Sequence, residues 1–383
     1  MPTDRLFGPS LTTPAMASAV SDVAWLSAML SFEAALADAQ AELDLIPREA
    51  ARDIVAACQV ERYDIEAIGR EAAHSASPVV ALIDSLRGMV GSQAASFVHR
   101  DATSQDVIDS AMMLVARDAL DVLLTDLGVL MARCAALAEQ HRDTPMVGRT
   151  LLQHARPITF GFKAATWLTG VLDARNHLAA IRKGRLAVQL GGAVGTLEGF
   201  DGRGREVLAA IARNLGLAEP ELPWHSNRGR VAELGSALAV AAGACAKIAL
   251  DVALLAQTEV GEVSVAAPGR SSAMSHKRNP ARAVEARAAF AGVTGQAAVL
   301  LAAMSGEHER SAGAWQSEWP ALSEAFRLAA GAVARTRETL TGLQVDVERM
   351  RINLGPSQDL GIGASALVDR ALEIYRGEVK DDG

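Results

Sequence analysis

Aromatic side chains are scarce in this chain of 383 residues: Phe, Trp and Tyr make up only 4%, although half of all residues are hydrophobic. Ala, Leu and Val supply the apolar bulk instead, and such residues pack closely between helices. β-Sandwiches and barrels depend on aromatic and β-branched strands, so the composition argues against them. A mostly helical fold is the expectation, with enough chain for one large domain or two to three small ones.

Cysteine and positive charge are also in short supply. Cys58, Cys134 and Cys245 stand far apart in Ala-rich surroundings, which excludes a disulfide framework or a zinc site of paired cysteines. We expect all three to be reduced and buried. The formal net charge is -8, so no global field attracts nucleic acid or a membrane surface. Acidic residues lack metal-ligand spacing, and we expect neither a metal nor another cofactor.

Hydrophobic runs free of charge are missing as well. Charges interrupt them, for example at Arg117, Asp118 and Asp126, so no run is typical of a transmembrane span. The N-terminal stretch has the features of neither a signal sequence nor a transit peptide. These absences predict a soluble, cytoplasmic protein.

Long stretches without helix breakers dominate what is present. Five of them predict long helices over 107–143, 160–187, 231–262, 280–304 and 316–343. No alternating strand pattern of any length stands out, so the sequence predicts an all-α bundle. The chain divides into an N-terminal helical domain (1–102), a central bundle domain (103–343) and a short C-terminal helical segment (344–383). Helices this apolar on all sides indicate an oligomer in which subunits cover one another.

Four polar or glycine-rich stretches interrupt the bundle. In "HRDATSQDVIDSAMM" (99–113), Thr103 or Ser104 caps a long helix and Asp106 lies in its first turn. An ordinary cap explains this pattern, and so does an anion site at the helix N-terminus.

The stretch "GRTLLQHARPITFG" (148–161) groups a guanidinium, a hydroxyl and an amide: Arg149, Thr150 and Gln153. Such donors match the oxygens of a carboxylate. Pro157 and Thr159 are expected to start the next helix. His154 beside Arg156 is either a base or an ordinary surface side chain.

The glycines of "LGGAVGTLEGFDGRG" (190–204) resemble a phosphate loop only superficially, because no Lys-Ser/Thr pair follows them. A tight reversal with close backbone approach is the structural alternative. The last stretch, "SSAMSHKRNP" (271–280), places positive charge before a helix N-terminus, where it opposes the helix dipole. A bound carboxylate would resolve this conflict, and Gly269 suggests a mobile lid.

Together these stretches resemble the motifs of the fumarase/aspartase superfamily. "SSAMSHKRNP" is similar to its signature loop, "TSQD" to its first motif and "GRTLLQHARPITFG" to its second, in the same order over roughly residues 20–345. The resemblance implies a subunit with a central five-helix bundle that associates into a homotetramer with a twenty-helix core. It also implies active sites that each collect motifs from three subunits.

One position separates the branches of this superfamily. Many lyases carry Thr-His in the second motif, whereas here Thr150 is followed by Leu151, which cannot transfer a proton. With "GEHERSAGAWQSEW" (306–319), this resembles the 3-carboxy-cis,cis-muconate cycloisomerase branch. That branch implies lactone formation from a tricarboxylate in protocatechuate breakdown (the β-ketoadipate pathway), without nucleic-acid or membrane partners.

The resemblance also implies roles for individual residues. Lys277 and Arg310 are the expected electrophilic or proton-donating pair, and Ser271 either exchanges a proton or hydrogen-bonds a carboxylate. His276 and His308 are weaker candidates near them. The predicted substrate-binding set is His99, Thr103, Ser104, Arg149, Thr150, Gln153, Ser272, Arg278 and Asn279.

Two other functions remain open. One is a lyase that releases fumarate from an adenylosuccinate- or argininosuccinate-type substrate, with another residue in place of the missing His. The other is a structural relative that has lost catalysis, against which the retained Ser271, Lys277 and Asn279 argue.

Overall fold

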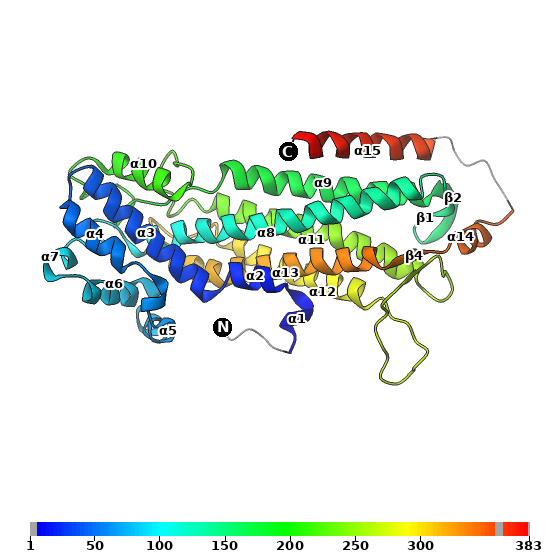
Figure 1. Ribbon diagram of the computed structural model, residues 1–383, viewed down its shortest axis with the longest axis horizontal. Coiled ribbons are helices and arrows are strands. Elements are labelled where there is room, and N and C mark those ends of the chain that lie inside the picture. Colours follow the sequence, from blue (N-terminus) through cyan, green and yellow to red (C-terminus); the bar gives the residue numbers. More distant parts are fainter. Residues whose placement is uncertain (1–5, 357–362, 382–383) are drawn as a thin grey trace.

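The computed structural model describes residues 6–356 and 363–381, and five long helices form its centre. They are α8 (Ser104–Gln140), α9 (Phe160–Gly184), α11 (Gly229–Leu255), α12 (Ala281–Ala302) and α13 (Ala314–Thr341). All five lie along the long axis of the molecule (Figure 1). The predicted all-α bundle is therefore confirmed, with helix ends that differ by up to seven residues from those expected.

Shorter elements gather at the two ends of the bundle. Seven helices precede it: α1 (Gly8–Leu11), α2 (Pro14–Ala19), α3 (Asp22–Glu42), α4 (Arg48–Ala57), α5 (Ile65–Ser75), α6 (Pro78–Met89) and α7 (Ser92–Ala95), with a 3-10 turn η1 (Val60–Arg62). Helix α10 (Gly204–Leu215) lies at the same end as α3 and α4 (Figure 1). At the other end lie α14 (Val347–Leu354) and the start of α15 (Gly363–Asp381), which packs along α9. The predicted C-terminal segment extends beyond the described residues at 357–362 and 382–383.

The N-terminal third of helix α8 is enclosed by neighbouring helices. Every residue from Gln105 to Ala116 is buried, because α3, α9 and α13 pack around it. Its N-cap is Thr103, as the sequence predicted, and the Asp106 carboxylate accepts a hydrogen bond from the Thr103 backbone N–H at 3.0 Å. Polar side chains within this buried stretch must therefore find partners inside the protein.

The second polar stretch is a β-hairpin, which the sequence analysis missed. Strand β1 (Pro145–Thr150) pairs antiparallel with β2 (Gln153–Thr159), with an irregularity in register between Val147 and Arg149. Pro157 lies in β2 and does not start the helix. Only Thr159 acts as predicted, since its side chain caps α9 by accepting from the Phe162 backbone N–H.

A second small sheet joins β3 (Val263–Val265) to β4 (Leu343–Val345). The expectation that no strands occur was therefore wrong for short elements. Pairs of strands this short carry too few residues for an alternating pattern to show.

The three cysteines are free, as predicted, and two of them are fully buried. Cys58 is only half-buried. Its burial and the nearby Glu33 and Asp38 carboxylates raise the pKa of its thiol to about 12. Burial likewise raises the pKa of Cys245 to about 12. Since the thiolate is the reactive form, neither cysteine is suited to nucleophilic chemistry.

Two helical stretches, Pro14–Glu42 and Gly229–Leu255, are long and apolar enough to cross a membrane by length and composition alone. Core helices of soluble proteins meet the same criteria. Helix α11 packs against α9, α12 and α13, and 56% of its most apolar window is buried in the subunit. Packing within the bundle therefore accounts for much of its hydropathy.

Candidate active site

The predicted site residues lie in three separate regions of the subunit. His99, Thr103, Ser104 and Arg310 lie near the N-terminal end of α8, whereas Arg149, Thr150 and Gln153 belong to the hairpin beyond its C-terminal end. Helix α8 has 37 residues, which at 1.5 Å per residue separates the two groups by about 55 Å. The loop that carries Ser271, Ser272, Lys277, Arg278 and Asn279 protrudes at the hairpin end (Figure 1).

Asp106 organises the first region. Its buried carboxylate accepts from the backbone N–H groups of Thr103 and Gly192, each at 3.0 Å, and lies 2.7 Å from Nε2 of His225. The Gln189 amide lies 3.4 Å away. These contacts tie the start of α8 to the glycine-rich stretch 190–204. We call Gln105, Asp106, Gln189, His225 and Arg310 the α8 cluster.

Arg310 belongs to this cluster through two protein acceptors. Its Nε donates to Oε1 of Gln105 at 3.1 Å, and Nη2 donates to the backbone oxygen of Ala193 at 3.0 Å. Gln105 in turn donates from Nε2 to the backbone oxygen of His225 at 2.9 Å. Arg310 is half-buried, so its guanidinium places a positive charge at the surface of the region.

His99 is paired with a buried carboxylate. Its Nδ1 lies 2.6 Å from Oε1 of Glu33, whose side chain is 1% exposed. Burial alone lowers the pKa of His99, but the charge of Glu33, its hydrogen bond and Asp106 outweigh that effect and raise the pKa. His99 also has a φ of 59°, an uncommon backbone conformation outside glycine. The Glu33 carboxylate thus favours the cationic form of the imidazole with which it pairs.

A second buried network joins α8 and α13 next to the α8 cluster. Arg228 binds Asp109 on α8 and Glu318 on α13 through paired hydrogen bonds, and all three side chains are buried. Burial raises the pKa of Glu318, and Arg228 opposes this shift. Trp315 also donates to Asp109 at 3.0 Å. These contacts fix α8 and α13 relative to the segment that carries His225.

Arg149 in the hairpin already has a carboxylate partner within the chain. Its Nη1 and Nη2 bind Oε2 and Oε1 of Glu262 at 2.9 and 2.7 Å. Glu262 is fully buried and also accepts from Asn353 at 2.9 Å. In this structure Arg149 therefore anchors the hairpin to the segment before β3, and its predicted contact with substrate stays a prediction.

The hairpin tip consists of two exposed leucines. Leu151 and Leu152 have φ values of 51° and 65° and are 96% and 74% exposed. Two positive φ angles match the favoured two-residue hairpin turn, in which Asn and Gly are preferred over Leu. Thr150, Gln153 and His154 beside the tip are also exposed. The strand pair thus presents an apolar tip flanked by polar side chains to the outside of the subunit.

The third region is a loop closed at its base. Gly269 and Asn279 exchange backbone hydrogen bonds at 2.8 and 3.3 Å. The residues at 272–278 are exposed, and Ser271 accepts from the backbone N–H groups of Ala273 and Met274. Within this chain, the loop brings Ser271 and Lys277 to no member of the α8 cluster, Arg310 included.

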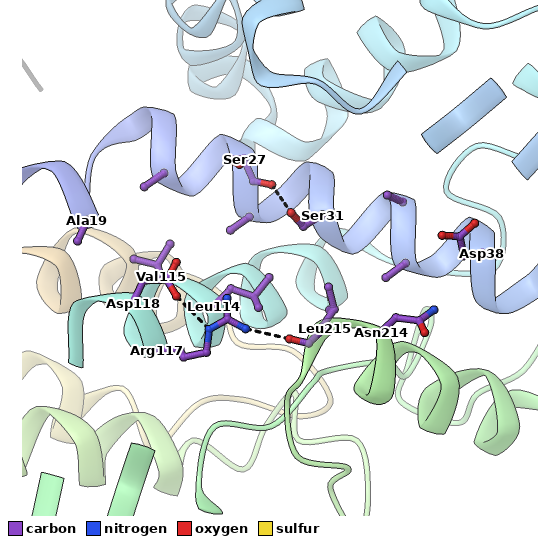
Figure 2. A pocket seen from close by; sticks show the side chains of 14 residues that line it. Ala19, Ser27, Ser31, Asp38, Leu114, Val115, Arg117, Asp118, Asn214 and Leu215 are labelled. Carbon is purple, nitrogen blue, oxygen red and sulfur yellow. Dashed lines mark hydrogen bonds and ion pairs between the residues drawn. The ribbon is translucent and has the colours of Figure 1, made fainter. Parts of the chain in front are cut away.

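A groove of about 520 Å³ lies between α3, α8 and α10, away from these three regions. Alanines and serines of α3 form one wall, and Arg117 closes another by donating to Asp118 and to the Leu215 backbone oxygen, both at 2.9 Å (Figure 2). None of the predicted site residues lines it. The described residues also contain no group of three or more His, Cys, Asp or Glu side chains that could hold a metal ion.

The sequence analysis missed much of the α8 cluster and its support. Asp106 was noted only as a first-turn residue, and Gln189, His225, Arg228 and Glu318 were not singled out. A Trp-His-Ser-Asn-Arg run at 224–228 is a usable signal, because such a polar group between apolar helices needs partners. Which partners it finds depends on three segments far apart in sequence.

Comparison with known proteins agrees with this architecture. A family model described as "Lyase" matches residues 10–295. Nitrosuccinate lyase of Streptomyces davaonensis is 48% identical over 351 residues, covering 88% of this chain and 74% of that protein. The 3-carboxy-cis,cis-muconate cycloisomerase of Bradyrhizobium diazoefficiens is 44% identical over 361 residues, covering 93% and 80%.

The similarity extends to the three-dimensional structure. The 3-carboxy-cis,cis-muconate lactonizing enzyme from Pseudomonas putida superposes with a TM-score of 0.87 at 38% identity, over 99% of this chain and 89% of that one. The resemblance predicted from the three motifs is thereby confirmed. The chain belongs to the lyase family of the fumarase/aspartase superfamily, a family of enzymes.

Proposed function

We propose that this protein is a cycloisomerase that converts 3-carboxy-cis,cis-muconate into 4-carboxymuconolactone, the protocatechuate-pathway reaction. The observation that carries the proposal is similarity over nearly the whole chain to proteins named for this activity, at 44%, 42% and 41% identity. In the reaction one substrate carboxylate adds to a double bond of the same molecule, and the neighbouring carbon gains a proton. The product is an isomer, so no fragment leaves.

The side chains of this protein suit that chemistry. A trianion needs cations and fixed donors around it, and the reacting groups are already joined, so electrostatic stabilisation is the main task. We assign Arg310 and Lys277 to charge stabilisation or proton delivery, and Ser271 to proton exchange or a hydrogen bond with a carboxylate. The proposed carboxylate-binding set is completed by His99, Thr103, Ser104, Arg149, Thr150, Gln153, Ser272, Arg278 and Asn279. Leu151 at the hairpin tip supplies an apolar wall and no proton.

We further propose that the enzyme works as a homotetramer, since its three site regions lie apart in one subunit. The outer face of α12 supports association. Small residues repeat there at Ala288, Ala291, Gly295 and Ala298, all exposed, and a Cβ added to Gly295 would meet nothing within 4 Å. Such a face allows another helix to approach closely.

The direct test is turnover of 3-carboxy-cis,cis-muconate, followed as loss of ultraviolet absorbance when the conjugated diene is consumed. The proposal predicts that absorbance falls while the product keeps the substrate's mass. Release of a smaller fragment, or no reaction at all, would reject it.

The identity of 48% to nitrosuccinate lyase favours a second candidate. Elimination from nitrosuccinate breaks a carbon–nitrogen bond and yields nitrite and fumarate. Colorimetric detection of nitrite therefore separates the two functions, because the cycloisomerase reaction cannot produce it. Binding of a polycarboxylate without turnover of either substrate would instead support a non-catalytic relative.

A further inference from the structure

We propose that His225 binds a carboxylate of the substrate through Nδ1, while Asp106 holds the opposite nitrogen of the ring. This inference rests on the proposed use of a polycarboxylate substrate. It adds to the site a residue that lies in none of the three motifs that the chain shares with its superfamily.

The orientation of the ring is set by Asp106. Nε2 of His225 lies 2.7 Å from Oδ1 of that carboxylate, and a carboxylate can only accept, so Nε2 carries the proton. Backbone N–H groups of Thr103 and Gly192 hold the other oxygen, Oδ2. The His225 backbone oxygen is held as well, by the amide of Gln105. His225 is therefore positioned by contacts at both its ring and its main chain.

The other ring nitrogen lacks a partner. His225 is 5% exposed, and Nδ1 makes no hydrogen bond to any residue in the described part of the chain. Buried polar atoms are nearly always hydrogen-bonded, because leaving one unpaired costs free energy. It is therefore unusual that Nδ1 of His225 has no partner when Nε2 and the backbone oxygen are both held. A hydrogen bond to a bound ligand would satisfy Nδ1.

Nδ1 faces the glycine-rich stretch. A Cβ added to Gly195 would lie 3.6 Å from Nδ1, and one added to Gly191 would lie 2.8 Å from the ring carbon Cε1. Glycine at 191 thus lets the backbone approach the ring edge, and the φ of 84° at Gly195 also favours glycine. Arg310 donates to Ala193 in the same stretch. Nδ1, Arg310 and the start of α8 therefore converge on one short segment.

The hydrogen-bond donors and the positive charge around Nδ1 of His225 determine which ligand would bind there. The Asp106 carboxylate accepts from two backbone N–H groups, lies within reach of the Gln189 amide and faces Nε2 of His225. A substrate carboxylate can only accept, so in the complex the ring would donate from both nitrogens, to Asp106 through Nε2 and to the ligand through Nδ1. Arg310 beside it and the α8 N-terminus favour the same kind of ligand.

Two substitutions distinguish the contributions of the two ring nitrogens of His225. In His225→Gln, the side-chain amide can reach Asp106 as Nε2 does, but nothing replaces Nδ1. In His225→Asn, the shorter amide can replace Nδ1 and loses the contact with Asp106. His177→Gln, at an exposed position on α9, is the matched control. The probe is tricarballylate, a non-reacting tricarboxylate, measured by isothermal titration calorimetry.

We expect His225→Gln to keep a Tm near that of the parent and to bind tricarballylate about tenfold more weakly, as loss of a charge-assisted hydrogen bond implies. His225→Asn should lower the Tm yet bind more tightly than His225→Gln, and His177→Gln should match the parent. Tricarballylate affinity of His225→Gln within twofold of the parent value would overturn the inference and leave Nδ1 with buried water only.

A crystal structure of the unaltered protein with tricarballylate tests the contact even if a variant fails to fold. A carboxylate oxygen within hydrogen-bond distance of Nδ1 supports the inference, and a ligand bound elsewhere rejects it. The proposed function fails separately: a parent protein that does not convert 3-carboxy-cis,cis-muconate, yet binds tricarballylate in a His225-dependent way, would leave this inference standing.

Discussion

At the scale of single residues, five buried carboxylates of this protein each face a cationic or imidazole partner. Glu33 faces His99, Asp106 faces His225, and Glu262 faces Arg149. Asp109 shares Arg228 with Glu318. Desolvating an unpaired charge is costly, so these pairs hold distant segments in one arrangement. Removing either partner leaves the other charge buried without compensation.

Arg149→Ala tests this reading at the hairpin. Glu262 would keep the Asn353 amide as a donor but lose both hydrogen bonds to the guanidinium. We expect the free energy of unfolding to fall by about 3 kcal/mol, as for a buried pair that loses one partner. Urea denaturation followed by circular dichroism measures this.

Arg70→Ala is the control for that measurement, because Arg70 is 68% exposed and pairs loosely with Glu66. Its loss should change stability by no more than about 0.5 kcal/mol. If Arg149→Ala weakens substrate binding while the unfolding free energy stays unchanged, Arg149 serves the ligand and not the hairpin.

At the scale of elements, the hairpin stores backbone strain where it is most exposed. Leucine at positive φ brings Cβ close to the following carbonyl oxygen, which Asn and Gly tolerate far better. Two adjacent leucines in this conformation, both largely exposed, are not explained by the stability of the subunit alone. We infer that the tip is kept for a contact outside its own subunit.

Replacing the tip by Asn-Gly, as Leu151→Asn with Leu152→Gly, should relieve the strain and remove the apolar contact. We expect the free energy of unfolding to rise by about 1–2 kcal/mol, given the cost of positive φ for a residue with a branched side chain. The kcat/KM for the muconate substrate should fall about tenfold or more, as loss of an apolar pocket contact allows. Leu152→Gly alone shows how much each leucine contributes. A double variant that is stabilised and fully active would show that the tip has no part in catalysis.

At the scale of the whole molecule, the long helices keep the site regions apart. The α8 cluster lies at one end of the bundle, while the hairpin and the loop around Lys277 lie at the other (Figure 1). The division into domains at 102 and 343 remains a prediction, although Thr103 caps α8 and β4 begins at Leu343. In the homotetramer that we propose, the far end of another subunit would complete each site, brought alongside by the outward face of α12.

Subunit mixing tests this arrangement. Lys277→Met and Arg310→Met should each be inactive alone, because each removes one proposed cation from every site. If a site draws these residues from different subunits, an equal mixture assembled by co-expression should regain about a quarter of the parent activity, by random association in a symmetric oligomer. Size-exclusion chromatography with light scattering checks that the mixed species is a tetramer. A mixture as inactive as its components would place both residues in one subunit's site.

Local chemistry in the sequence was enough to predict the helical class, the five long helices and the superfamily. Long stretches rich in Ala and Leu favour helix through local propensity. Thr103 and Thr159 cap their helices through hydrogen bonds between residues three apart in sequence. The motif stretches were likewise found as sequences, because Gly, Ser, Lys and Arg stand out among Ala and Leu.

Contacts between distant segments depended on the tertiary structure. The hairpin forms because β1 and β2 pair with each other. Strands this short show no clear alternation of apolar and polar residues from which they could be predicted. Glu262 pairs with Arg149, which lies more than a hundred residues away in the sequence. Asp106 contacts His225 across a similar sequence separation. A side chain's partners follow from burial, which local sequence leaves open. Only the packed bundle therefore decided which charges face each other, and which nitrogen of His225 has no hydrogen bond among residues 6–356 and 363–381.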